Sequence, residues 1–226
     1  LAPATNSGGR LDVGALVHGV QRPVCRPDRF DLDRFSDVDP DSVHAAGIAC
    51  LNDQEVVSGY ADGTFQPGAP VRREQLTALL ARMLVAEGFA PSTAPPDYVD
   101  VHPDSEHAWA IAMLDELKIV QGDATGRFRP HEPVRRDHMA ALMVRTYRVL
   151  TDTSPTPSRR WFNDLADNHH RRAIDIGRDL GILRGVGADD YAPALTTRRD
   201  QVATFMARLL DAVEREAASS GGSGSS

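Results

Sequence analysis

The sequence is poor in several features that mark common classes of protein. Aromatic residues make up 6% of its 226 positions, and only two positions are cysteine. No apolar run approaches the roughly 18 residues that a membrane-spanning helix needs, so we expect no membrane insertion. The formal net charge of -7 disfavours binding to nucleic acid, whose phosphates would be repelled. The common hydrolase, zinc-peptidase and phosphate-loop motifs are absent, so we predict no enzyme, no metal site and no cofactor.

What is present is the composition of a soluble globular chain, with 41% hydrophobic and 25% charged residues. The N-terminal segment, residues 1–34, has no clear pattern, although Leu11–Val20 is compatible with a short helix that docks on the rest. The opening Leu-Ala-Pro-Ala resembles the small residues left beside a signal-peptide cleavage site. The end of the chain, residues 215–226, is predicted to be a flexible linker or an added tail.

A threefold repeat dominates the rest of the sequence. Gly59, Gly122 and Gly185 are spaced 63 residues apart. The same ungapped offset relates three prolines, three aromatics, three histidines and three arginine pairs: Pro67, Pro130 and Pro193; Phe65, Phe128 and Tyr191; His44, His107 and His170; Arg72-Arg73, Arg135-Arg136 and Arg198-Arg199. Such a period is the signature of a repeat architecture. We predict one domain, residues 35–214, built from repeats at about 35–89, 98–150 and 162–212.

Each repeat has the pattern of two helices. An aromatic-x-Asp turn opens it, a first helix follows, a glycine-centred turn ends that helix, and a second helix begins at the Arg-Arg-acid step. The first helices are predicted at roughly 44–54, 107–117 and 170–180. Because one two-helix unit cannot bury both of its apolar stripes alone, the three units must pack together. The predicted fold is therefore all-α, with three two-helix repeats packed as a pseudo-threefold spindle or bundle.

The two cysteines leave two interpretations open. In an oxidising compartment Cys25 and Cys50 can form one disulfide that ties the N-terminal segment to the first repeat, if their Cα atoms lie close enough. Alternatively, Cys50 is a buried thiol, because it falls on an apolar position of the first predicted helix. The sequence does not decide between them.

The repeats resemble the S-layer homology family over residues 35–212. The resemblance rests on Gly-Tyr-Ala-Asp-Gly-Thr-Phe-Gln-Pro at 59–67, followed by Val-Arg-Arg-Glu-Gln at 71–75. Residues 197–208 of the third repeat look like the variant common in high-GC Gram-positive (actinobacterial) bacteria. The resemblance implies a three-pronged spindle that binds cell-wall polysaccharide in grooves between its prongs. It also implies a secreted protein in which this module holds another domain at the cell wall or cell surface.

The resemblance also implies candidate ligand-binding residues. The family's groove arginine falls on Arg73, Arg136 and Arg199, the turn aspartate on Asp37, Asp100 and Asp164, and the loop glycine on Gly59, Gly122 and Gly185. A guanidinium fork suits the anionic group of a wall polysaccharide, because it donates two parallel hydrogen bonds. Alternatively, each arginine pairs with the turn aspartate and has a structural role. For Arg82, Arg145 and Arg208, deeper in the second helices, we favour a structural ion pair.

The sequence departs from the family at two positions of each repeat. The family's helix-capping threonine is replaced by Arg72, Arg135 and Arg198. Its tryptophan near the start of the first helix is missing. Trp109, three positions later and in the second repeat alone, is kept as a further candidate ligand-binding residue. The recurring histidines, at 44, 107 and 170, then have three interpretations: a zinc site on the pseudo-threefold axis, a sugar-stacking residue, or a partly buried side chain hydrogen-bonded to a neighbouring loop.

We therefore predict a non-catalytic module that anchors a secreted protein to the cell envelope by binding an anionic wall polysaccharide between its repeats. The alternative is a structural or protein-binding module, with other surface proteins as partners, that has lost glycan binding. The first repeat keeps the fullest turn motif, so we expect its groove to be the best candidate for binding.

Overall fold

The structure, a computed structural model, describes Cys25 and residues 31–221. Its architecture is all-α, as predicted. The elements run in the order α2 (Ala45–Asp53), α3 (Arg73–Ala86), α4 (Ala108–Glu116), α5 (Arg136–Thr151), the short 3₁₀-helix η2 (Asn163–Leu165), α6 (Arg171–Asp179) and α7 (Arg199–Gly221). No helix in this described part has both the length and the apolarity to cross a bilayer. Each repeat contributes a first helix (α2, α4 or α6) and a second helix (α3, α5 or α7).

The first helices have nearly the predicted bounds, but the motif that ends them is not the predicted glycine-centred turn. Each stops one residue earlier than expected, in a Schellman motif that precedes the glycine turn. In α2, Glu55 has a left-handed backbone with φ of 58°, and the Val56 amide donates to the Leu51 carbonyl at 2.9 Å. Lys118 and Gly181 repeat this conformation after α4 and α6. The following apolar residue is buried, which fixes where the chain leaves the helix.

The second helices begin at the predicted Arg-Arg-acid step. Arg72 has an extended backbone (φ −83°, ψ 158°), and the helical conformation starts at Arg73. Apolar residues at Leu76, Leu80 and Leu84 follow at intervals of one helical turn, and all three are fully buried. The amphipathic pattern is therefore sufficient to set which face of α3 points inward.

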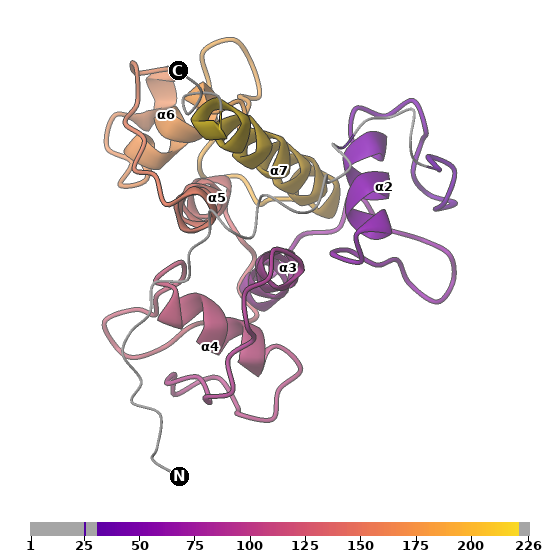
Figure 1. Cartoon of the computed structure of the whole chain (residues 1–226), viewed down its shortest axis with the longest axis vertical. Helices are drawn as coiled ribbons and strands as arrows, with labels where there is room; N and C mark the ends of the chain where they lie inside the picture. Colours follow the sequence, from indigo (N-terminus) through magenta and orange to yellow (C-terminus); the bar gives the residue numbers. More distant parts are fainter. Residues whose placement is uncertain (1–24, 26–30, 222–226) are drawn as a thin grey trace.

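The helices of different repeats pack on one another in a cycle. The second helix of each repeat packs against the first helix of the next: α3 on α4, α5 on α6, and α7 back on α2. Figure 1 shows α3, α5 and α7 around the middle of the molecule, with α2, α4 and α6 at three outer corners. The main helix that packs on each first helix is therefore the second helix of the preceding repeat.

A ring of three main-chain hydrogen bonds closes the bundle at its centre. The Val71 amide donates to the Thr197 carbonyl (3.0 Å), the Thr197 amide to the Val134 carbonyl (2.8 Å), and the Val134 amide to the Val71 carbonyl (2.8 Å). These residues directly precede the second helices, and isolated β-bridges flank them. The ring uses one donor and one acceptor from each repeat, so no repeat is left with an open end.

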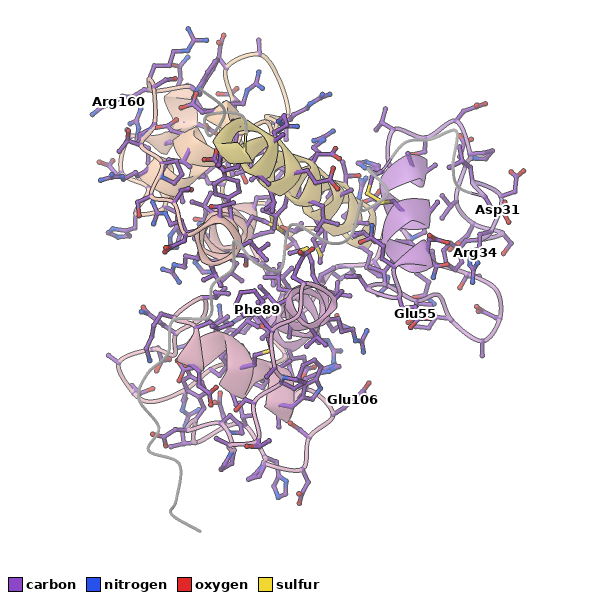
Figure 2. The ribbon with its side chains drawn as sticks, in the orientation of Figure 1. Asp31, Arg34, Glu55, Phe89, Glu106 and Arg160 are labelled. Atoms are coloured by element: carbon purple, nitrogen blue, oxygen red, sulfur yellow. A yellow bond between two sulfur atoms is a disulfide. The ribbon has the colours of Figure 1, made fainter. Side chains whose placement is uncertain are left out.

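The cysteine question is resolved in favour of a disulfide. Cys25 and Cys50 are bonded, with their Cα atoms 5.3 Å apart, so the N-terminal segment is tied to α2. The predicted helix at Leu11–Val20 lies outside the described residues. Figure 2 shows the disulfide in yellow beside α2, and it shows Asp31, Glu106 and Arg160 on the outside of the three corners.

The boundary predicted at residue 215 for a flexible tail was wrong. Helix α7 continues from Arg199 to Gly221, so residues 215–221 are helical. The segment begins with Arg-Glu-Ala-Ala, which are strong helix formers and extend a helix that tertiary packing has already started.

Candidate ligand-binding grooves

The turn aspartates hold the loop that follows each first helix. Asp37 accepts hydrogen bonds from the amides of Phe65 (2.7 Å) and Gln66 (2.8 Å). Asp100 and Asp164 accept the equivalent pairs at 2.7–3.0 Å in their own repeats. A carboxylate that accepts two amides orders a loop strongly, because both bonds are charge-assisted. The structure thus gives these predicted site residues a loop-holding position.

The recurring arginines reach the same loops from the neighbouring repeat. Arg199 donates through Nε to the Phe65 carbonyl (2.9 Å) and through Nη2 to the Ser58 carbonyl (3.1 Å). Arg73 and Arg136 do the same to the loops of the second and third repeats. Each guanidinium also lies 4.6–4.7 Å from an aromatic ring centre of that loop. The arginines therefore bond to main-chain carbonyls, in place of the Arg–Asp pairs considered from the sequence.

The loop glycines are required by close packing. A Cβ at Gly59 would overlap the ring of Phe35 and lie 2.7 Å from the Thr64 carbonyl. Gly122 meets the ring of Tyr98 in the same way. The aromatic of the opening turn thus lies so close to the loop backbone that only glycine fits there. These glycines shape the loop beneath the candidate site.

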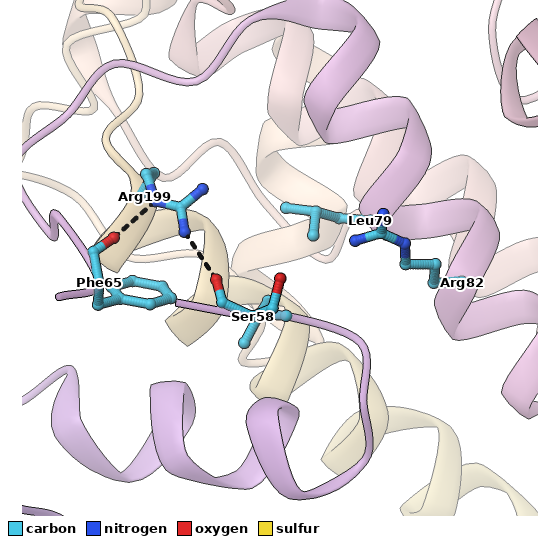
Figure 3. A pocket seen from close by; sticks show the side chains of 6 residues that line it. Ser58, Phe65, Leu79, Arg82 and Arg199 are labelled. Carbon is cyan, nitrogen blue, oxygen red and sulfur yellow. Dashed lines mark hydrogen bonds between the residues drawn. The ribbon is translucent and has the colours of Figure 1, made fainter. Parts of the chain in front are cut away.

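Two equivalent cavities lie between repeats, beside these arginines. Groove one has a volume of about 50 Å³ and is lined by Val57, Ser58, Phe65, Leu79, Arg82 and Arg199. Groove two has a volume of about 200 Å³ and is lined by Arg73, Val120, Gln121, Gly122, His138, Ala141, Leu142, Arg145 and His170. Figure 3 shows groove one, with Arg199 bonded to the loop and with Leu79 and Arg82 on the facing helix. The larger cavity thus belongs to the second repeat, whereas the sequence had favoured the first.

At the third equivalent position, the arginine is enclosed. Arg136 is 3% exposed, against partial exposure of Arg73 and Arg199. Its guanidinium carbon lies 4.6 Å from the ring centre of Tyr191 and 5.7 Å from that of Phe205. Phe205 takes the position that leucine has in the other two repeats, and its larger ring covers the arginine. A ligand cannot reach Arg136 without moving that ring.

The two open grooves are basic. Each carries two guanidinium groups, from Arg199 and Arg82 in groove one and from Arg73 and Arg145 in groove two, and no carboxylate is among the lining residues that the structure describes. Burial lowers the pKa of Arg73, Arg145 and Arg199, which nevertheless remain cations at neutral pH. Cations that are partly desolvated and lack a carboxylate partner attract an anion strongly.

The recurring histidines do not converge on the axis. His44 lies 2.6 Å from the Thr204 hydroxyl and 3.8 Å from Asp200, both on α7. His170 lies against His138 of α5, and His107 is a partly exposed residue before α4. Within the described residues, no group of three or more possible metal ligands forms. The zinc interpretation was therefore wrong, because His44 faces α7 whereas His170 faces α5, the second helix of a different repeat.

Three lining residues were missed or misjudged from the sequence. Arg82 and Arg145 line the grooves, and Arg145 donates to the Ile119 carbonyl (2.9 Å), whereas we had favoured a structural ion pair. His138 breaks the repeat, since the equivalent positions hold Gln75 and Gln201. That break is the signal that marks His138. Trp109 lies outside both grooves and packs, partly buried, against the core.

The structure is thus a closed ring of helical repeats with basic grooves between them. Residues 34–77 and 98–140 match the model of the S-layer homology domain. The first two repeats are therefore S-layer homology repeats, as the sequence predicted, and the chain is a secreted protein of the cell surface or cell wall. The third repeat lies outside the matched segments but has the same hydrogen bonds and helix packing.

Several known proteins are similar to nearly the whole chain. An S-layer protein of Bacillus thuringiensis subsp. finitimus is 29% identical over 215 residues, which is 90% of this chain and 24% of that protein. The S-layer protein sap of Bacillus anthracis gives the same figures. An endoglucanase of a Bacillus species (strain KSM-635) is 30% identical over 182 residues, 78% of this chain and 18% of that protein. The chain thus spans a quarter or less of these relatives, and its predicted origin in the high-GC Gram-positive group stays a prediction.

Proposed function

We propose that this cell-surface anchoring module holds a larger protein by binding an anionic cell-wall polysaccharide in grooves one and two. The observation that carries the proposal is the charge of the two cavities. Each presents two arginines and no carboxylate, in a chain whose net charge is -7. An anionic group is the ligand that compensates such a site, and planar guanidinium groups favour a carboxylate or a phosphate.

The shape of the site supports a polymer with repeated anionic groups. The two grooves are equivalent by the internal repeat, so both can take the same chemical unit from one chain or from two. Binding at two sites raises the overall affinity well above that of each groove, provided the polymer spans both. Similarity to S-layer proteins and to an endoglucanase over a quarter or less of their lengths is typical of a module attached to different partners.

The test is retention of the purified chain on a purified bacterial wall polysaccharide. The informative variant is R73A/R199A, which removes one arginine from each open groove and leaves the buried Arg136 in place. The matched control is R34A/R160A, which removes the same charge from two exposed arginines outside the grooves. We expect the wild type and the control to be retained, and we expect the groove variant to bind at least about tenfold more weakly, because a charge-assisted hydrogen bond contributes about 1.5–3 kcal/mol.

Two results would count against the proposal. No retention of the wild type would favour the alternative, a structural or protein-binding module, in which the arginines only hold the loops through their carbonyl bonds. Equal retention of a folded R73A/R199A variant would remove the grooves from the binding site.

A further inference from the structure

Groove two contains a pair of histidines that has no counterpart in groove one. The rings of His138 and His170 lie 5.1 Å apart in an edge-to-face arrangement. His138 comes from the first turn of α5, and His170 directly precedes α6. Both side chains are half-buried and line the cavity together with Arg73 and Arg145. The cavity is thus surrounded by two permanent cations and two groups that can become cations.

His138 faces the cavity because it cannot do what its equivalents do. In α3, the side-chain oxygen of Gln75 accepts a hydrogen bond from the Arg72 amide at 2.9 Å. In α7, Gln201 accepts from the Arg198 amide in the same way at 3.2 Å. Both glutamines thereby cap their own helix. The second repeat replaces this cap with an imidazole that contacts His170 across the repeat interface.

The histidine before α2 is engaged within the protein instead. His44 contacts the Thr204 hydroxyl and lies near Asp200, so a carboxylate is already available to it. His170 lies near the equivalent carboxylate, Asp137, but its ring partner is another histidine and not a hydroxyl. The repeats therefore differ at this position: His44 is hydrogen-bonded within the protein, whereas His170 forms a pair with His138 that lines groove two.

The charged groups around the pair leave no carboxylate free to balance added protons. The groups that face His138 or His170 are Asp137, Glu132, Arg73, Arg135, Arg145 and His169. Asp137 accepts from Arg135 at 2.9 Å, from Asn168 at 2.9 Å and from the His138 amide at 2.9 Å. Glu132 is held by Arg129 at 3.1 Å. Protonation of the histidines therefore adds positive charge that an external anion is needed to compensate.

Building on the proposed function, we propose that groove two is a proton-coupled anion site. His138 and His170 take up protons when an anionic group of the wall polymer binds, so the affinity of groove two rises as the pH falls below neutrality. Groove one, which has arginines and no histidine, binds without this coupling.

The direction of the effect follows from the free protein. Burial lowers the pKa of both histidines below the ordinary value of 6.5 and outweighs the opposite effect of Asp137, so both rings are neutral at pH 7.5. Neighbouring cationic groups lower both pKa values further: Arg73 and Arg135 for His138, and His138 and Arg145 for His170. A bound anion favours the charged form and raises the pKa again. Affinity is then highest at a pH below the free pKa values and is lost as the pH rises through the bound ones. A rise of about one unit for one histidine makes the affinity about tenfold higher in acid.

The experiment is an NMR titration of the imidazole signals of the intact chain with sulfate and, separately, with formate. Both probes keep their charge between about pH 5.5 and 7.5, so any pH dependence belongs to the protein. We expect at least one of the two anions to raise the pKa of His138 and His170 and to bind about tenfold more tightly at the lower pH. The exposed His102 serves as an internal control and should not respond.

The matched variant is His138→Gln, which installs the residue that the first and third repeats hold at this position. We expect it to fold normally and to bind the anion with a much weaker pH dependence. An unchanged pH dependence in this variant, or histidine pKa values that ignore both anions, would overturn the inference. Retention of the wild type on wall polysaccharide at pH 7.5 is measured separately. Retention without a pH-dependent response of the histidines would refute the proton coupling alone, and a histidine response without retention would refute the wall-binding proposal alone.

Discussion

Replacing Arg136 by alanine should destabilise the protein far more than the equivalent change at Arg73. Both arginines occupy the same position of the repeat and bind the next loop through two carbonyls. They differ in their surroundings: Arg136 is 3% exposed and is covered by Tyr191 and Phe205, whereas Arg73 borders an open cavity. Without its guanidinium, the carbonyls of Tyr191 and Arg184 lose that partner in a site that water reaches poorly.

The size of the difference can be worked from these contacts. Arg136 makes two hydrogen bonds of 3.0 Å, and a bond to a charged donor contributes about 1.5–3 kcal/mol. The aromatic contacts add about 1 kcal/mol, and non-additivity reduces the sum, so R136A should cost about 3–5 kcal/mol. Arg73 has one short bond of 2.9 Å and one long bond of 3.4 Å beside solvent, and R73A should cost about 1–2 kcal/mol. At about 2–4 °C per kcal/mol, the Tm of R136A should fall by about 6–20 °C.

Urea unfolding and thermal unfolding of R136A and R73A measure this difference in stability directly. R73A serves as the control, since it removes the same side chain from the same helix position. Equal losses in the two variants would refute the claim that burial by Phe205 sets Arg136 apart. A stable R136A that loses polysaccharide binding would likewise contradict its assignment as a structural residue.

Two further predictions concern the loops and the N-terminal tether. In urea unfolding, Gly122→Ala should cost about 1–3 kcal/mol because the new Cβ would overlap Tyr98. The control Gly68→Ala, which has open space around it, should change stability by less than about 0.5 kcal/mol. Similar losses in the two variants would show that the loop around Gly122 adapts to the added methyl group. Reducing the Cys25–Cys50 bond, which closes a 25-residue separation, should lower stability by about 3 kcal/mol. Cys50→Ala should show that loss already and should not respond further to a reductant, while an unaffected wild type would mean that the tether contributes nothing.

The sequence period was sufficient to predict most of the fold. An ungapped 63-residue offset places both helices of each repeat, because the apolar stripes and the Arg-Arg-acid step recur together. It did not reveal that α7 packs on α2, since the stripe on every second helix is equally suited to its own first helix and to the next. It also misplaced the end of the domain, because local composition at 215–221 suits a helix as well as a linker.

The candidate site was predictable only in part. The arginine positions were correct as members of the inter-repeat interface, but their partners were main-chain carbonyls, which a sequence does not display. The three inter-repeat interfaces differ from one another because of single substitutions within the repeat: Phe205 replaces a leucine, and His138 replaces a glutamine. Both are visible as breaks in the period, but their effect depends on which side chain lies opposite, and that comes from the tertiary structure.

The cyclic packing has a consequence for how the protein reaches its folded state. Arg199 binds the Phe65 carbonyl across 134 residues of sequence, and His44 contacts Thr204 across 160. Contacts so distant in sequence are costly in chain entropy until they form, so they slow folding. Helix α2 gains its packing partner only after α7, the second helix of the third repeat, has been made. The first repeat therefore waits for the third, and a chain shortened by one repeat loses two of the three interfaces of the ring.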